Sequence, residues 1–113
     1  MRLTSETKDG IAVLTISGKF VFDESLLLFR EKVRGFLHAG TTKFIFDFSG
    51  VPYCDSSGCG EIIGAFASIR KAGGVVAFLK PAERVYVLWT RIRLTDLFNI
   101  FKTLDEAEAF VRR

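Results

Sequence analysis

The tetrapeptide Asp55-Ser56-Ser57-Gly58 places two hydroxyl groups beside a carboxylate, between an apolar segment and an amphipathic one. Asp and Ser are frequent N-cap residues, so one interpretation is that these side chains begin a helix. The other is a phosphorylation site, because a helix N-terminus at the end of a parallel strand favours an anion. The motif leaves both interpretations open.

Metal binding and nucleophilic catalysis find little support in the sequence. A zinc site needs three or four ligands, and Cys54 and Cys59 have no second pair, while the single histidine, His38, falls in another segment. The nucleophile-elbow pattern G-x-S-x-G is absent, and a catalytic triad would have to use His38. We therefore expect no metal, no cofactor and no enzymatic activity, and we interpret both cysteines as buried thiols.

Gly58, Gly60 and Gly64 suggest a nucleotide site, because glycines at the start of a helix also occur in dinucleotide-binding motifs. Their spacing is G-x-G-x-x-x-G, however, and the next apolar segment ends in LKP rather than in an acid that could bind a ribose. Close approach of another backbone to the helix explains these glycines better. Titration with ATP, GTP and dinucleotides would test the nucleotide alternative.

Length and composition bound the fold. The chain has 113 residues, of which 49% are hydrophobic and 26% charged, as is typical of one globular domain. The net charge is +3, but Lys and Arg are interleaved with Asp and Glu, so nucleic acid is not a favoured partner. No signal-peptide pattern is present, and no apolar run approaches the roughly 20 residues that span a bilayer. We expect one domain over residues 1–113, located in the cytoplasm.

Apolar periodicity predicts the elements that position the motif. Strands are expected over residues 2–7 and 11–17, joined by an Asp-Gly turn that suits a hairpin at a sheet edge. A helix is expected from about 23 to 39, and an apolar run predicts a central strand over 43–48. The apolar face expected for this helix comprises Leu26, Phe29, Val33, Phe36 and Leu37.

The second half of the sequence alternates helices and strands. A helix follows Ser57, strands are expected over 75–79 and 99–102 with a helix between them, and Thr103 with Glu106 predicts the cap of a last helix. This order predicts an α/β fold: a mixed, mostly parallel sheet with an N-terminal hairpin, packed against about four helices. The helix after Ser57 is expected to bury Cys59, Ile62, Ile63, Phe66 and Ile69. In the next helix Val85, Leu88, Trp89 and Ile92 share one face, and the apolar positions of the last helix are Ala107, Phe110 and Val111.

The order of these motifs resembles the STAS domain, a family found in anti-sigma factor antagonists and sulfate transporters. The stretch FIFDFSGVPYCDSSGCGEIIGAFASIRKAGGVVAFL resembles the family's apolar strand, D-x-S-x-V, D-S-S-G, amphipathic helix, G-G and second apolar strand. The stretch RLTDLFNIFKTLDEAEAF resembles its C-terminal L-x-x-L-F, short strand and acidic helix. The resemblance covers nearly the whole chain and implies a STAS-like fold.

The resemblance also implies a function. In antagonists of this family, an anti-sigma factor that is a serine kinase phosphorylates the first serine of D-S-S-G, and a phosphoserine phosphatase reverses the modification. This implies Ser56 as the phosphoacceptor, with Ser57 as its rival, within a partner-binding loop of Asp55, Ser56, Ser57 and Gly58. The unmodified protein would bind the anti-sigma factor kinase, and the phosphorylated protein would dissociate, regulating sigma-factor-dependent transcription.

A second function is compatible with the family. The chain could serve as a STAS scaffold, or as a small subunit of a membrane-associated transporter complex, without a phosphoswitch. Phe20, Phe22 and Trp89 are candidates for an exposed contact surface, and the sequence favours no oligomeric state.

Three segments depart from the family pattern. Cys59 stands where an aliphatic residue usually follows D-S-S-G. The segment from Gly18 to Asp23 replaces G-x-L-D, which leaves the start of the first helix and its partner contacts open. The segment Ile92-Arg93-Leu94 replaces T-G-L, so Arg93 is expected in a turn that often needs glycine.

Overall fold

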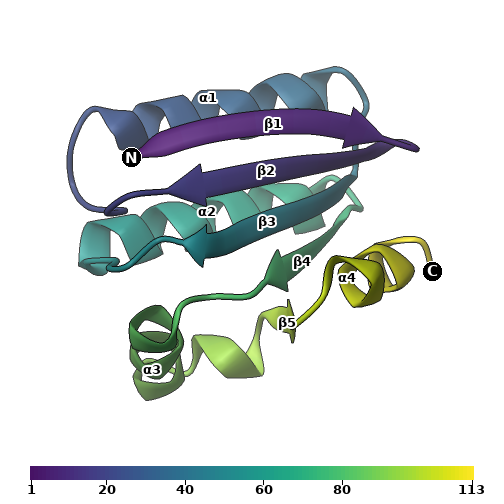
Figure 1. The fold of residues 1–113 in the computed structure, drawn as a ribbon. Coiled ribbons are helices and arrows are strands. Elements are labelled where there is room, and N and C mark those ends of the chain that lie inside the picture. Colours follow the sequence, from purple (N-terminus) through teal and green to yellow (C-terminus); the bar gives the residue numbers. More distant parts are fainter.

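A five-stranded sheet runs through the computed structural model, which describes residues 1–113 (Figure 1). The spatial order is β1-β2-β3-β4-β5; β1 is antiparallel to β2, and the remaining neighbours are parallel. This confirms the predicted mixed, mostly parallel sheet with an N-terminal hairpin. The strands are β1 (Arg2–Lys8), β2 (Ile11–Ser17), β3 (Lys43–Gly50), β4 (Val75–Leu79) and β5 (Asn99–Phe101).

The hairpin turn and the outermost strand follow the sequence prediction. Asp9 and Gly10 adopt φ angles of 53° and 80°, the left-handed conformations that a tight hairpin requires. Strand β1 is the edge of the sheet. At the other end of the chain, Arg93 has φ of 66°, so the turn where glycine was expected does require a left-handed residue.

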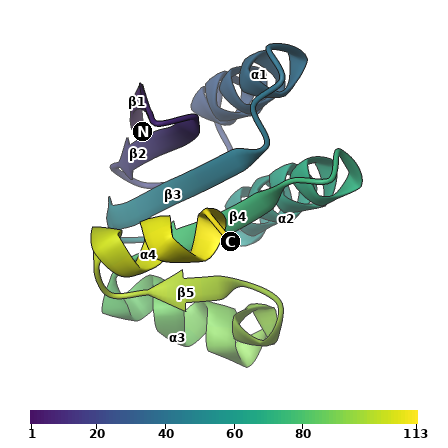
Figure 2. The ribbon, with the colours of Figure 1, turned by 90° about the vertical axis from the view of Figure 1, so that its right-hand side faces the viewer.

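Helices cover both faces of the sheet. Figure 2 shows α1 (Ser25–His38) and α2 (Ser56–Lys71) on one side, and α4 (Leu104–Val111) on the other. Helix α3 (Glu83–Arg91) and the 3₁₀ helix η1 (Leu94–Asp96) lie between β4 and β5 in the chain and extend the core on the side of α1 and α2. The four helices agree with the prediction.

Side chains of β3 alternate between two hydrophobic cores, as the twofold period of a strand requires. Phe44, Phe46 and Phe48 belong to the larger core, under α1, α2 and α3, while Ile45 belongs to the smaller core under α4. Aromatic rings dominate the larger core, where Phe78 stacks on Phe98 with centroids 4.1 Å apart. The larger core therefore extends to Phe48, near the carboxyl end of β3.

Some burial predictions are wrong. Phe20 and Trp89, expected as contact-surface candidates, are fully buried, whereas Phe22 is 79% exposed. Ile63, expected to be buried, and Ile92, expected on the apolar face of the helix after Pro81, are both exposed. Ile63 lies off the stripe of α2 that faces the sheet, and Ile92 lies beyond the end of α3, where the chain turns away. Periodicity alone does not decide which of two adjacent apolar residues points inward.

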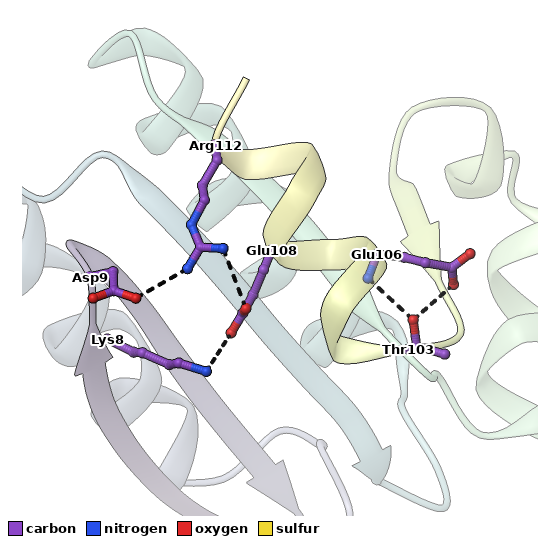
Figure 3. A network of polar contacts seen from close by, with 6 residues as sticks. All are labelled: Lys8, Asp9, Thr103, Glu106, Glu108 and Arg112. Atoms are coloured by element: carbon purple, nitrogen blue, oxygen red, sulfur yellow. Dashed lines mark hydrogen bonds and ion pairs between the residues drawn. The ribbon is translucent and has the colours of Figure 1, made fainter.

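The C-terminal helix is tied to the N-terminal hairpin by charged side chains (Figure 3). Glu108 of α4 is buried, and its carboxylate lies 3.3 Å from Lys8 Nζ and 3.6 Å from Arg112 Nη1. Arg112 Nη2 in turn lies 3.3 Å from the Asp9 carboxylate. Segments from opposite ends of the sequence thus pack together around one buried carboxylate.

None of the helices is both long and apolar enough to cross a bilayer.

Candidate functional site

The Asp55-Ser56-Ser57-Gly58 motif lies where β2, β3 and β4 end and the loops to α1, α2 and α3 begin (Figure 1). The loop after β2 is hydrogen-bonded to the loop after β3: Phe20 N donates to Tyr53 O at 2.9 Å, and Asp55 N donates to Phe20 O at 3.3 Å. Phe20 and Cys54 also form an isolated parallel bridge. These bonds continue the pairing of the sheet beyond β2 and β3, which fixes the backbone at the start of α2.

Asp55 is the N-cap of α2. Its Oδ1 accepts a hydrogen bond from Gly58 N at 2.8 Å, and its Oδ2 accepts one from Phe22 N at 3.0 Å. These bonds, that from Gly58 first and that from Phe22 second, hold the pKa of the Asp55 carboxyl below its usual value. Asp55 therefore stays ionised and joins three segments: the loop after β2, the loop after β3 and α2.

Capping by Asp55 leaves the serine hydroxyls without a structural task. Ser56 and Ser57 are both exposed in the first turn of α2, and neither side chain makes a hydrogen bond within the protein. They face different grooves, since Ser56 lines one between α2 and α3 and Ser57 lines one between α1 and α2. The helix-cap interpretation therefore applies to Asp55, and both serine hydroxyls face solvent.

The groove beside Ser56 has a volume of ≈ 680 Å³ and is lined by both basic and acidic side chains. Arg84 and Arg91 of α3 line it, together with the carboxylates of Asp55 and Glu83. The Arg84 guanidinium lies over the Tyr53 ring, 4.8 Å from its centroid. An anion that forms on Ser56 would therefore share this groove with two arginines and two carboxylates.

The groove beside Ser57, between α1 and α2, has a volume of ≈ 550 Å³. Arg30 bridges the two helices through a pair of bonds to Glu61, at 2.7 and 3.1 Å. Gly60 and Gly64 line this groove, and a Cβ at either would meet no atom within 4 Å. The prediction that these two glycines admit a neighbouring backbone is therefore wrong, because they face open space.

Gly58 is the glycine that does admit a close neighbour. A Cβ at this position would overlap the carbonyl oxygen of Phe20 and lie 3.0 Å from Cys54 Sγ. Its amide also donates the capping bond to Asp55. Gly58 therefore packs the start of α2 against the loop that follows β2.

Cys54 and Cys59 are buried, as expected, and are 1% and 3% exposed. Their sulfur atoms lie 3.4 Å apart. The sequence analysis missed this contact, since the spacing of the two cysteines matches neither one helical face nor a strand register. No group of three His, Cys, Asp or Glu side chains is arranged to hold a metal ion.

Comparison with known proteins places the chain in a family. The STAS domain model matches residues 2–107. A candidate anti-sigma factor antagonist from Thermotoga maritima is 28% identical, with 98% of this chain and 95% of that chain covered and a TM-score of 0.90. No curated protein shows significant sequence similarity.

Two further solved structures share the fold at lower identity. The phosphorylated form of the Bacillus cell fate determinant SpoIIAA is 20% identical, with 97% and 99% of the two chains covered and a TM-score of 0.76. A sulfate transporter family protein from Wolinella succinogenes is 20% identical, with 95% and 88% covered and a TM-score of 0.73. On the family match and the shared architecture, the chain belongs to the STAS domain family.

Proposed function

We propose that this protein is an anti-sigma factor antagonist, and that residues 1–113 act as one non-enzymatic STAS domain in the cytoplasm. In its unmodified form it binds an anti-sigma factor that is also a serine kinase. Phosphorylation of Ser56 releases it, and a phosphoserine phosphatase restores binding. Similarity to the Thermotoga candidate antagonist, at 28% identity, supports this choice among STAS functions.

The observation that carries the proposal is the position of Ser56. Its hydroxyl is exposed at the N-terminus of α2, and the neighbouring carboxylate already caps the helix. Modification of Ser56 therefore removes no hydrogen bond that the fold needs. The phosphorylated structure of SpoIIAA, which has the same fold, is consistent with a STAS domain that accepts phosphate without refolding.

A phosphate on Ser56 changes the charge of the binding loop. It adds about −1.5 to −2 charges next to the Asp55 carboxylate. The helix N-terminus and the arginines of the adjacent groove, Arg84 and Arg91, stabilise the phosphate within the free protein. In a complex, the same charge is desolvated or placed near like charges, which costs several kcal/mol and weakens binding by orders of magnitude.

Phe22 extends the proposed partner-binding loop. Its side chain is 79% exposed, while its backbone N–H is bonded to Asp55. An exposed aromatic ring held beside the modifiable residue is suited to serve as an anchor in an interface. The surface we propose for the partner therefore comprises the Asp55–Gly58 loop and Phe22.

Phosphosite mapping tests the proposal. The protein is used to capture its partner from the native cell extract, and the complex is incubated with Mg-ATP. We expect label on Ser56, its loss in Ser56→Ala with binding retained, and weakened capture by Ser56→Asp. Ser57→Ala is the matched control, since it removes the adjacent hydroxyl, and it should leave labelling unchanged. Label that persists in Ser56→Ala would contradict the assignment.

The transporter alternative has one supporting observation, the similarity to the Wolinella sulfate transporter family protein. In that role the domain is a scaffold or small subunit of a membrane-associated complex and carries no phosphoswitch. The captured partner distinguishes the two functions, because a serine kinase and a transporter differ in mass and in ATP-dependent labelling of Ser56.

A further inference from the structure

Cys54 and Cys59 flank the Asp55–Gly58 motif, one at each end. Their sulfur atoms are 3.4 Å apart. They are the only two cysteines of the chain, so each thiol has a single neighbour of its kind. A disulfide holds its sulfurs at about 2.05 Å, so a small local approach is sufficient to form the bond.

We propose that Cys54 and Cys59 form a reversible intramolecular disulfide that closes the Asp55–Gly58 loop into a covalent ring. The disulfide is a modification site in its own right. Its regulatory consequence, that oxidation blocks phosphorylation of Ser56, rests on the proposed function. Reduction of the bond returns the loop to the state in which Ser56 can be modified.

The surroundings of the pair favour ionisation of one thiol. The two sulfurs lie within hydrogen-bonding distance, and this contact lowers the pKa of Cys59. The same interaction, followed by burial, raises the pKa of Cys54. The buried indole N–H of Trp89 has no hydrogen-bond partner of normal geometry, yet it lies close enough to lower the pKa of Cys59 as a donor. Cys59 is thus the thiol that becomes the nucleophilic thiolate.

A small oxidant can reach the pair. Cys54 lines the groove of ≈ 680 Å³ that also holds Ser56, but Cys54 and Cys59 are only 1% and 3% exposed, so peroxide reaches the sulfurs when this loop opens locally. Gly58 packs so closely against Phe20 and Cys54 Sγ that even a Cβ would not fit, which closes this side of the sulfurs to larger molecules. The burial therefore shields the sulfurs from bulky thiols and favours an oxidant as small as peroxide.

The chemistry balances with peroxide as the oxidant. The Cys59 thiolate attacks one peroxide oxygen, the O–O bond breaks, and a sulfenic acid and one water form once the leaving hydroxide is protonated. The Cys54 sulfur then attacks the sulfenic sulfur; the S–S bond forms, the S–O bond breaks, and the leaving hydroxide takes the Cys54 proton and departs as a second water. Two thiols lose two electrons and two protons, and one peroxide is reduced to two waters.

The ring removes freedom that phosphoryl transfer needs. A kinase must bring the Ser56 hydroxyl in line with the γ-phosphate of ATP, which requires the loop to adapt to the kinase active site. In the reduced protein, hydrogen bonds alone hold this loop, from Asp55 to Gly58 N and Phe22 N. In the oxidised protein a covalent bond joins its two ends, so we expect phosphorylation to stop.

Intact-mass measurement tests the disulfide on wild-type protein treated with hydrogen peroxide. We expect a monomer that has lost two hydrogens, that regains them with dithiothreitol, and that keeps its near-ultraviolet circular dichroism. Addition of oxygen atoms, a disulfide between two chains, loss of the dichroism signal or an unchanged mass would each overturn the proposal. Peptide mapping assigns the bond without any variant. Cys54→Ala and Cys59→Ala are the matched controls, and neither should lose two hydrogens.

A second measurement separates this inference from the proposed function. The captured kinase is offered reduced, oxidised and re-reduced protein, and we expect label on Ser56 in the first and third only. Labelling of Ser56 without disulfide formation would overturn the inference alone. A disulfide with no labelling of either form would overturn the proposed function and the regulatory consequence, while the bond itself stands. Equal labelling of both forms would overturn the regulatory consequence.

Discussion

At the scale of single residues, Asp55 joins the segments of the candidate site. One oxygen caps α2 through Gly58 N, and the other holds the loop after β2 through Phe22 N. Because the carboxylate takes on both bonds, Ser56 and Ser57 remain available. Because Asp55 provides the helix cap, Ser56 beside it can be modified without loss of a hydrogen bond that the fold needs.

Replacement of Asp55 by Asn tests this task. The amide has one acceptor oxygen, so Asp55→Asn keeps the bond from Gly58 N and turns an N–H₂ group toward Phe22 N. We expect the free energy of unfolding to fall by about 1 kcal/mol at neutral pH. Urea denaturation measures the change, and Ser57→Ala is the control that alters the same turn without removing a cap.

The same variant predicts a pH dependence. Since the folded-state pKa of Asp55 is lowered, its contribution to stability is present above the unfolded value of 3.8 and is lost as the pH falls through the folded value. The difference between wild type and Asp55→Asn should therefore be largest near neutrality and shrink below about pH 3.8. A difference that grows on acidification would contradict the assigned direction.

At the scale of elements, α2 contains glycines with two different tasks. Gly58 packs against the Phe20 backbone, where no side chain fits. Gly60 and Gly64 face the open groove between α1 and α2, and they weaken the helix without any packing gain. Glycines that the sequence alone treats as one set therefore divide according to the surface that each of them faces.

Alanine substitutions distinguish the two kinds of glycine. Gly58→Ala forces a methyl group into the Phe20 carbonyl and should lower the free energy of unfolding by about 2 kcal/mol or more. Gly64→Ala places its methyl in open space and should raise it by roughly 0.5–1 kcal/mol. Thermal and urea unfolding measure both effects. If both substitutions changed the free energy of unfolding equally, the proposed difference in packing between Gly58 and Gly64 would be contradicted.

The sequence predicted the elements well because their signals are local. The Asp9-Gly10 turn, the apolar runs of β3 and β4, and the cap at Thr103 each depend on a few adjacent residues; the Thr103 hydroxyl does accept a bond from Glu106 N at 3.2 Å. The burial of Phe20 and Trp89 and the contact between the two thiols depend on how distant loops meet. Those features need the tertiary structure. The residue types of Asp55–Gly58 indicate a helix cap or a phosphorylation site, while the choice of Ser56 as phosphoacceptor follows from the family resemblance and stays a prediction.

At the scale of the whole molecule, the buried carboxylate of Glu108 joins α4 to the hairpin. Lys8 and Arg112 balance its charge, and both cations are themselves partly exposed. Removal of Glu108 therefore leaves cations that water can solvate, whereas removal of both cations leaves a carboxylate with no partner. The cost of disrupting this network is expected to be asymmetric.

A set of variants measures that asymmetry. The double variant Lys8→Ala, Arg112→Ala should lower the free energy of unfolding by about 3 kcal/mol, because it leaves the buried Glu108 carboxylate without a cationic partner. Glu108→Gln should change it by about 1 kcal/mol or less. Adding Glu108→Gln to the double variant should recover most of the loss. Failure of this rescue in urea denaturation would show that Glu108 contributes mainly by packing.

The link between Asp9 and Arg112, which are 103 positions apart, has a consequence for biosynthesis. The hairpin leaves the ribosome well before α4. Until α4 has been synthesised and packs on the sheet, Ile11, Val13 and Ile45 remain uncovered on this face. The nascent chain therefore presents an apolar strand surface throughout translation of the intervening residues, and we expect it to be prone to aggregation during this interval.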